Sequence, residues 1–347
     1  MKNLYMSLIA LLLTLTSCNA NFKSVGVDKF EEIITDSKIA IVDVRTPEEY
    51  ADGHLRLACN YDWRSDDFLF QMEAAFPKTT PLAIYCRSGK RSAAAAKVLV
   101  KAGYTVYNMK GGYLDWTACS KPTTQYDVET FTTDSGIPVA ITLIKHGTLA
   151  ISYNGKTIHV DPVGGYGKPT DYATEFAKAD AILITHEHGD HFDKEAIDAL
   201  EEDGKTEIVT NANCAEALGR GTALFNGDIK SLFGEIELEA VPAYNYTEGR
   251  TQFHSKGRDN GFVLTIDGLR IYIAGDTEDI PEMAGIKDID IAFLPVNQPY
   301  TMTVDQCVNE ANMIAPKVLI PYHFSDTDLS GLPERLPRIK VIIRQMM

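Results

Sequence analysis

The segment from Thr185 to Asp193, THEHGDHFD, concentrates side chains that bind metal ions. It includes the end of an apolar run that predicts a buried strand at 181–185. Within six residues it carries His186, His188, Asp190 and His191. Imidazole nitrogens and carboxylate oxygens are the ligands that Zn²⁺ accepts in catalytic sites that keep a position open for water. The spacing indicates a metal centre, and a set of surface histidines in front of a helix is the alternative interpretation.

A second chemical group is the thiol of Cys86, which follows an apolar run at 82–85 that predicts a strand. Residues 87–91 can curl around the thiol, so their backbone N–H groups and the positive end of the next helix would bind an anion. Cationic side chains in the loop would favour thiolate over thiol. The anion-binding loop comprises Arg87, Ser88, Gly89, Lys90, Arg91 and Ser92. The pattern indicates a nucleophilic cysteine.

Strand and helix signals alternate around Cys86. Apolar runs rich in β-branched residues predict strands at 39–44, 82–85 and 105–108. One helix begins at Pro47, and another spans 92–102 with Ser92 as its N-cap. This alternation predicts an α/β domain with a parallel sheet and flanking helices.

The chain around the histidine cluster combines hairpin signals with strand–helix units. Asn154-Gly155 and Asp267-Gly268 each separate two apolar runs, which is a strong hairpin signal. Further strands are predicted at 181–185, 207–210, 292–296 and 318–321, and helices at 194–201 and 214–218. The mixture predicts two sheets covered by helices. Between the two blocks, residues 122–135 are polar and Thr-rich, and we interpret them as an interdomain linker.

With its HxHxDH signature, the stretch 136–347 resembles the metallo-β-lactamase fold superfamily, and within it the lactonase-like and phosphodiesterase-like hydrolases. The resemblance implies an αββα sandwich. It also implies that Asp276 bridges two metals, that His323 is the last histidine ligand, and that Asp161 orients a ligand.

The same resemblance leaves other positions open. The family's third histidine would be His254, with a looser site completed by Asn245 or water as the alternative. His146 resembles a histidine at the first strand of this branch, where it would line the pocket or be structural. Asn297 and Tyr300 follow a strand whose end should face the metals, so they are candidate substrate contacts.

The implied chemistry is hydrolysis of a small-molecule lactone, ester or phosphodiester. Two divalent metals would lower the pKa of a shared water and stabilise the leaving oxygen. Zn²⁺ is the first choice, with Mn²⁺ or Fe²⁺ as alternatives. Asp190 would double as the proton carrier.

Three segments of the first block resemble the rhodanese family over residues 22–120. They are IVDVRTPEEYADGHL, YCRSGKRSAAAAKVLVKAGY and YNMKGGYLDW. The resemblance implies that Cys86 carries sulfane sulfur as a persulfide between a donor and an acceptor. It implies that Asp43 and Arg45 brace the cysteine loop. The turn after GHL lacks the family's usual Pro-Gly pair.

Three interpretations of the whole chain follow. The first is a metallohydrolase fused to a rhodanese-like sulfurtransferase. The second is a mononuclear-iron persulfide dioxygenase coupled to rhodanese, since the HxHxDH cluster can serve either metal. The third is a non-catalytic binding module. For the cysteine loop, a phosphate-binding C-x5-R loop is a further alternative, but Ser92 takes the arginine position and Arg91 comes one residue early.

Composition and the N-terminus bear on partners and location. The 347 residues suggest two domains, and the net charge of −15 argues against a nucleic-acid partner, which needs a basic surface. Residues 1–18 hold a short positive region and an apolar run that ends in Leu-Thr-Ser-Cys, which resembles a bacterial lipobox. The resemblance implies an exported lipoprotein, anchored to a membrane of the cell envelope through Cys18 on the periplasmic or surface side. A plain secretory signal or an N-terminal anchor is the alternative.

Overall fold

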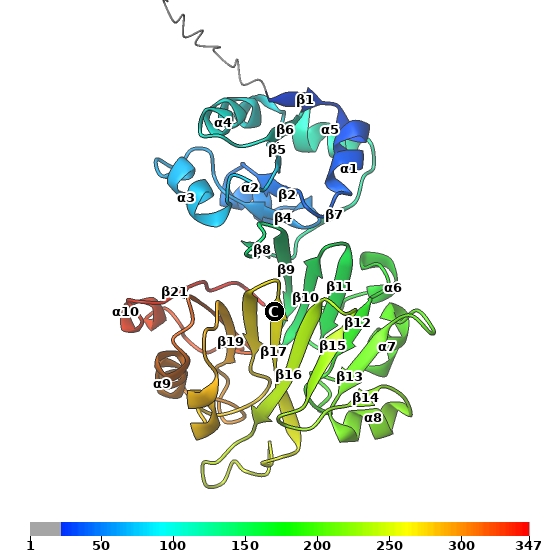
Figure 1. The fold of residues 1–347 in the computed structure, drawn as a ribbon, viewed down its shortest axis with the longest axis vertical. Helices are drawn as coiled ribbons and strands as arrows, with labels where there is room; N and C mark the ends of the chain where they lie inside the picture. Colours follow the sequence, from blue (N-terminus) through cyan, green and yellow to red (C-terminus); the bar gives the residue numbers. More distant parts are fainter. Residues whose placement is uncertain (1–21, 347) are drawn as a thin grey trace, which may run out of the picture.

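The computed structural model describes residues 22–346. The expected signal peptide and Cys18 lie outside the described residues. Figure 1 shows a smaller domain, from β1 to β7, above a larger one that begins at β8. Between residues 22 and 346, no helix combines the length and the apolar character needed to cross a membrane.

The smaller domain contains the parallel sheet that the alternating signals predict. Within the described residues its strand order is β1-β6-β5-β2-β4, and all four pairings are parallel. The strands are β1 (Lys23–Val25), β2 (Ala40–Asp43), β4 (Ala58–Asn60), β5 (Leu82–Tyr85) and β6 (Val106–Met109). A separate antiparallel pair joins β3 (His54–Leu55) to β7 (Thr123–Thr124).

Helices cover both faces of this sheet because its central strands are apolar on both sides. The helices are α1 (Val27–Ile34), α2 (Pro47–Ala51), α3 (Phe68–Ala75), α4 (Lys90–Lys101) and α5 (Gly112–Ala118). Met72 of α3 and Leu99 of α4 pack on one face, and Phe30 of α1 and Trp116 of α5 pack on the other.

The N-cap predicted for the helix after Cys86 is wrong. The helix α4 begins at Lys90, and its N-cap is Gly89, whose φ of 80° lies in the left-handed region. The residue predicted as the cap, Ser92, lies in the first turn instead. Its hydroxyl points to the Cys86 thiol, with an Oγ–Sγ distance of 3.5 Å. Ser92 is the third residue of the helix and therefore not its N-cap.

The larger domain stacks two mixed sheets between helices (Figure 1). Within the described residues, the strand order of the first is β14-β13-β12-β11-β10-β9-β8, and that of the second is β15-β16-β17-β18-β19-β20-β21. The first sheet consists of β8 (Val128–Thr132), β9 (Pro138–Lys145), β10 (Thr148–Tyr153), β11 (Lys156–Val160), β12 (Ala181–Leu183), β13 (Glu207–Thr210) and β14 (Thr222–Ala223). The second consists of β15 (Ile229–Leu232), β16 (Ile236–Ala243), β17 (Asp259–Ile266), β18 (Leu269–Ile273), β19 (Ile291–Pro295), β20 (Val318–Tyr322) and β21 (Lys340–Val341).

Apolar side chains between the two sheets form the main core. Both predicted hairpins are present: β10 pairs antiparallel with β11, and β17 with β18. Alternate residues of these strands, such as Leu149, Ile151 and Leu264, are fully buried between the sheets. The outer faces are covered by α6 (Tyr172–Glu175), α7 (Lys194–Leu200) and α8 (Ala212–Leu218), and by η1 (Pro281–Gly285), α9 (Val304–Ile314) and α10 (Leu332–Arg335). The arrangement is the predicted αββα sandwich.

The segment expected to be a linker, 122–135, contains two strands. One of them, β8, is the edge strand of the first sheet and pairs antiparallel with β9. It also contacts β4 and α3 of the smaller domain. There the backbone N–H of Val128 donates to the Tyr50 hydroxyl at 3.1 Å. Polar composition concealed this strand, because β8 includes threonines and one of them, Thr130, is buried despite being polar.

Candidate functional site

The predicted metal-binding residues converge at one edge of the sandwich. His186 follows β12, and Asp276 and His323 follow β18 and β20 of the other sheet. All three side chains are almost completely buried. Because both sheets end at this edge, segments far apart in the sequence contribute to one cluster.

The first donor group consists of His186, His188 and His254, whose ligand atoms lie within 4.8 Å of one another. The ring of His254 is held through Nδ1, which lies 3.0 Å from Asp259 Oδ2. The structure therefore places His254, the candidate for the third histidine, in this donor group. Asn245 lies next to His254, since its backbone N–H donates to the His254 carbonyl at 2.9 Å, but its side-chain amide donates to the Tyr300 carbonyl at 2.7 Å.

The second donor group contains His146, Asp190, His191 and His323, again with ligand atoms within 4.8 Å of one another. His191 is oriented by Asp161, because its Nδ1 lies 2.8 Å from Asp161 Oδ2. His146 joins the group through its Nε2, which lies 3.2 Å from Asp190 Oδ2. Its ring centroid is 3.6 Å from that of His323. The structure thus places His146 in the cluster.

Asp276 lies between the two groups. One carboxylate oxygen, Oδ2, is 3.4 Å from His254 Nε2 and 3.2 Å from His323 Nε2. The other, Oδ1, is 3.3 Å from His191 Nε2. Asp276 thus has a carboxylate oxygen near histidines of both donor groups.

The cluster offers lone pairs without protein partners. Within residues 22–346, Nε2 of His186, His191 and His323 and Oδ1 of Asp276 are buried and lack hydrogen-bond partners. Such atoms are costly to bury unless another group satisfies them. A set of imidazole nitrogens and carboxylate oxygens suits Zn²⁺, Mn²⁺ or Fe²⁺. The residues therefore fit a divalent metal.

The electrostatics of Asp276 and His186 agree with ligand chemistry, whereas nearby carboxylates overcome the effect of burial and raise the pKa values of His191, His254 and His323. Burial alone would raise the pKa of Asp276, but the facing His323 and His191 hold it well below its usual range. Burial lowers the pKa of His186 well below its usual range. Metal ligands must be deprotonated carboxylates and neutral imidazoles. These two residues therefore already favour the protonation states that metal ligands need.

Three residues of the site adopt a strained backbone. His146, Asp161 and His323 have φ values of 44°, 45° and 47°, in the left-handed region that side chains other than glycine rarely adopt. The backbone N–H of His323 donates to the His146 carbonyl at 3.1 Å. Strain of this kind is tolerated where the surroundings fix the conformation. Here it turns side chains at strand ends into the cluster.

The predicted substrate contacts lie beside the donor groups. Tyr300 is 46% exposed, and its ring packs edge-on against Phe253, the neighbour of His254. The amide of Asn297 donates to the Ser325 hydroxyl at 3.3 Å. Both belong to the loop after β19.

The supporting residues of His254 were not found from the sequence. Arg258 donates to Asp259 at 2.7 Å, and Asp259 in turn contacts His254. The adjacent residues Arg258 and Asp259 follow the histidine in FHSKGRDNGF. The signal in the sequence for this support was Asp259, which comes shortly after the candidate ligand His254.

Cys86 lies in the smaller domain, at the end of β5, and its side chain is buried. The start of α5 supports its loop: the backbone N–H of Tyr113 donates to the Cys86 carbonyl at 2.8 Å. A Cβ at Gly112 would lie 2.2 Å from the same carbonyl, so only glycine permits this contact. Gly112 belongs to the segment YNMKGGYLDW, whose sequence alone does not reveal this role.

Ion pairs brace the cysteine loop. Arg91 binds Glu49 of α2 with two hydrogen bonds of 2.6 and 2.7 Å. Asp43 and Arg45, which were expected to brace the loop, form a buried ion pair with its shortest contact at 2.6 Å. The remaining cations of the loop, Arg87 and Lys90, are exposed, so they are available to an anion in solution.

Comparisons with known proteins agree with this architecture. Residues 140–323 match the beta-lactamase superfamily domain, and residues 26–119 match the rhodanese-like domain. A metal-dependent hydrolase of Geobacillus sp. (strain WCH70) is 31% identical over 194 residues, covering 53% of this chain and 85% of that protein.

Solved structures of metal-dependent hydrolases also match this chain. A crystal structure of a protein from Parabacteroides distasonis, described as a metal-dependent hydrolase, shows 53% identity. It covers 64% of this chain and 100% of its own, with a TM-score of 0.62. The metallo hydrolase Igni18 from Ignicoccus hospitalis, at 24% identity, shares the fold with a TM-score of 0.51, covering 60% of this chain and 95% of its own.

The larger domain is thus a metallo-β-lactamase fold that carries a cluster of potential metal ligands. The chain belongs to the β-lactamase superfamily and bears a rhodanese-like domain on the N-terminal side of the hydrolase fold.

Proposed function

We propose that the larger domain is a metal-dependent hydrolase of small-molecule lactones, esters or phosphodiesters. The observation that carries this proposal is the cluster around Asp276, where imidazoles from both sheets direct unpartnered nitrogens at one carboxylate in the described chain. The relatives described as metal-dependent hydrolases support it.

In this proposal, the donor groups hold two divalent cations, with Zn²⁺ as the first choice. One cation would be held by His186, His188 and His254, the other by Asp190, His191 and His323, with Asp276 between them. Bound cations of this kind activate water and polarise the bond to be cleaved.

The protein's own contribution is orientation and proton transfer. Asp161 and Asp259 fix the ring orientations of His191 and His254 through Nδ1, which leaves Nε2 for the metal. The side chain of Asp190 is 27% exposed, whereas that of Asp276 is 3% exposed. Because solvent reaches part of the Asp190 side chain, we assign the proton released from the water to its carboxylate.

The cluster favours hydrolysis over the mononuclear-iron alternative. A single iron held by two histidines and one carboxylate would use only part of it. The described residues provide one group of three ligands and another of four, and a third group, His186, His191 and Asp276, shares one histidine with each of them. The complete ligand set also disfavours a non-catalytic module.

Hydrolysis is tested with metal-loaded protein, using bis(4-nitrophenyl) phosphate and an aryl lactone as probes. The Asp276→Asn variant should lose about 100-fold or more in kcat/KM, because the bridging charge is removed. A Lys78→Gln variant, altered at an exposed ion pair in the smaller domain, should retain wild-type turnover. Unchanged turnover in Asp276→Asn would contradict the assignment.

The smaller domain suggests a second activity, sulfur transfer through Cys86. The buried thiol lies in a loop with exposed cations and a hydroxyl contact from Ser92. We propose that thiosulfate transfers its sulfane sulfur to Cys86 Sγ, which releases sulfite, and that a nucleophilic acceptor such as cyanide then removes that sulfur.

A Cys86→Ser variant separates the two activities. It should lose thiosulfate:cyanide sulfur transfer and retain hydrolysis at the wild-type rate, because the two sites lie in different domains. The measurement is thiocyanate formation. Sulfur transfer that persists in Cys86→Ser would refute the role of this thiol.

A further inference from the structure

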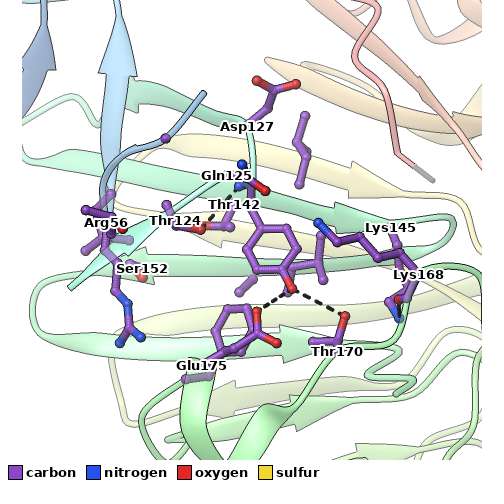
Figure 2. Close-up of a pocket in the computed structure, with 18 of the residues that line it drawn as sticks. Arg56, Thr124, Gln125, Asp127, Thr142, Lys145, Ser152, Lys168, Thr170 and Glu175 are labelled. Atoms are coloured by element: carbon purple, nitrogen blue, oxygen red, sulfur yellow. Dashed lines mark hydrogen bonds between the residues drawn. The ribbon is translucent and has the colours of Figure 1, made fainter. Parts of the chain in front are cut away.

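The loop between β11 and α6, residues 162–170, has the metal centre on one side and a cavity on the other. The cavity, about 780 Å³, lies at the domain boundary and is lined by both domains. Figure 2 shows Lys145 and Lys168 along one wall of it, with Thr170 nearby. Behind Lys168 and Thr170 the loop therefore faces space instead of packed protein.

The sequence of this loop provides little stiffness of its own. It contains Gly164, Gly165 and Gly167, and it forms no helix or strand. A loop with three glycines and a cavity behind it needs another restraint to keep one shape. That restraint comes from Lys145, whose Nζ donates to the carbonyls of Gly164 and Tyr166 at 3.0 Å each and to the Lys168 carbonyl.

The ammonium group of Lys145 uses all of its N–H donors on this loop. Lys145 is 1% exposed, and its three N–H donors match three carbonyl acceptors. The ion pairs found within residues 22–346 do not include Lys145, so these hydrogen bonds must offset the cost of burying the charge. Because all three N–H donors of this buried lysine bind carbonyls of the loop, we infer that the position of the loop matters.

The loop presents one aromatic side chain to the metal centre. Tyr166, between Gly165 and Gly167, is 42% exposed. Its ring centroid lies 4.5 Å from that of His146, which contacts Asp190. Tyr166 therefore forms an apolar wall beside the second donor group.

The opposite side of the cluster also carries exposed aromatic surface. Tyr300 is 46% exposed and packs against Phe253, with ring centroids 5.0 Å apart. Phe253 directly precedes His254 of the first donor group. Exposed rings thus flank both halves of the centre, which favours a substrate with apolar groups.

We propose that Tyr166 is a substrate-binding residue that contacts an apolar, preferably aromatic, group of the substrate, and that Lys145 is the positioning residue that holds it there. This inference rests on the proposed hydrolase function and specifies its substrate class. The ring supplies the contact, so the hydroxyl of Tyr166 is dispensable.

The test compares the binding of phenylphosphonate and methylphosphonate to metal-loaded protein by calorimetry. Both probes offer the same oxygens to the metals and differ only in the apolar group. The wild type should prefer the phenyl probe. Tyr166→Ala should reduce that preference by about 3- to 10-fold, the range of an aromatic contact, and leave methylphosphonate affinity unchanged.

Two further variants separate the ring from the loop. Tyr166→Phe should keep the wild-type preference, and Lys145→Met should lose it as Tyr166→Ala does, with metal content unchanged. Phe70→Ala removes a 73% exposed ring in the smaller domain and serves as the control, with wild-type behaviour expected.

Several outcomes would overturn the proposal. These are the absence of phosphonate binding or of a phenyl preference in the wild type, a preference retained in Tyr166→Ala, and a preference lost in Tyr166→Phe. Failure of the hydrolase function is distinguishable, because it would appear as phosphonate binding without turnover of any ester, lactone or phosphodiester probe. The matched pair bis(4-nitrophenyl) phosphate and methyl 4-nitrophenyl phosphate should show the same change in kcat/KM ratio.

Discussion

Two histidines of the proposed metal centre, His191 and His254, are held through Nδ1 by buried carboxylates. Asp161 is fully buried and accepts hydrogen bonds from the backbone N–H and the hydroxyl of Thr185, at 2.7 Å each, as well as contacting His191. This arrangement fixes both the ring angle and the tautomer of His191. The affinity of the centre for metal should therefore depend on a residue that touches no metal.

Replacing Asp161 by Asn tests this dependence. The amide would remove the negative charge and place an N–H₂ group where donors already point, so His191 should lose its orientation. We expect metal affinity to fall about 10- to 100-fold, measured by competition with a chromophoric chelator. Asp180→Asn, altered at a carboxylate paired with Lys156, is the control. Wild-type affinity in Asp161→Asn would refute the positioning role.

At the residue scale, spacing in the sequence could identify only part of this centre. His186, His188, Asp190 and His191 are adjacent in the chain, so their pattern is visible. The inclusion of His146 depends on a left-handed backbone at that residue and on contacts with distant strands. The choice between His254 and Asn245 depended on loop shape, which composition does not specify.

At the element scale, strand ends and helix starts bring the reactive groups together. The buried strands could be predicted because their apolar runs are continuous, as at β5 and β12. Elements with mixed burial, such as the edge strands β8 and β15, were not predicted. Which of their residues are buried depends on neighbouring elements, and the sequence alone shows little periodicity in these strands.

The contact between α2 and α4 gives a pH-dependent prediction. The hydrogen bonds from Arg91 lower the pKa of Glu49 from 4.5 to about 2, despite the opposing effect of burial. Because the folded pKa lies below the unfolded one, the ion pair stabilises the domain fully above pH 4.5 and loses this contribution as the pH falls toward 2. Glu49→Gln should cost about 1 kcal/mol at pH 7 and progressively less in acid.

Tryptophan fluorescence during urea unfolding measures this effect, because both tryptophans of the chain, Trp63 and Trp116, lie in the smaller domain. The control is Glu73→Gln, which removes an exposed ion pair with Lys78, in which the Glu73 side chain is 45% exposed. This variant should change the free energy of unfolding little at any pH. A Glu49→Gln penalty that stays constant from pH 7 to pH 3 would contradict the assigned pKa.

At the scale of the whole molecule, the two domains contact each other through β8, which belongs to the larger sheet and packs on the smaller domain. Alternating strand and helix signals sufficed to predict the fold class of the smaller domain, and hairpin signals, together with the family resemblance, predicted that of the larger one. The contact between the domains could not be predicted, since it depends on a strand in a segment that was expected to be a linker.

The anchoring of the chain is a further prediction at this scale. We propose that Cys18 is lipid-modified, on the basis of its lipobox-like context in the sequence. In a bacterial host, the wild type should sediment with membranes and Cys18→Ala should not, as detected by immunoblotting of fractions. Mass spectrometry of the N-terminal peptide should show an acylated Cys18. A wild type found only in the soluble fraction would rule out the anchor.

The most direct test of the central claim is the metal content of the purified chain. Elemental analysis should find two divalent metals per chain in the wild type, and about one in His188→Ala and in His323→Ala, because each variant disables a different donor group. A single iron per wild-type chain, or two metals retained in both variants, would contradict a centre built from these residues.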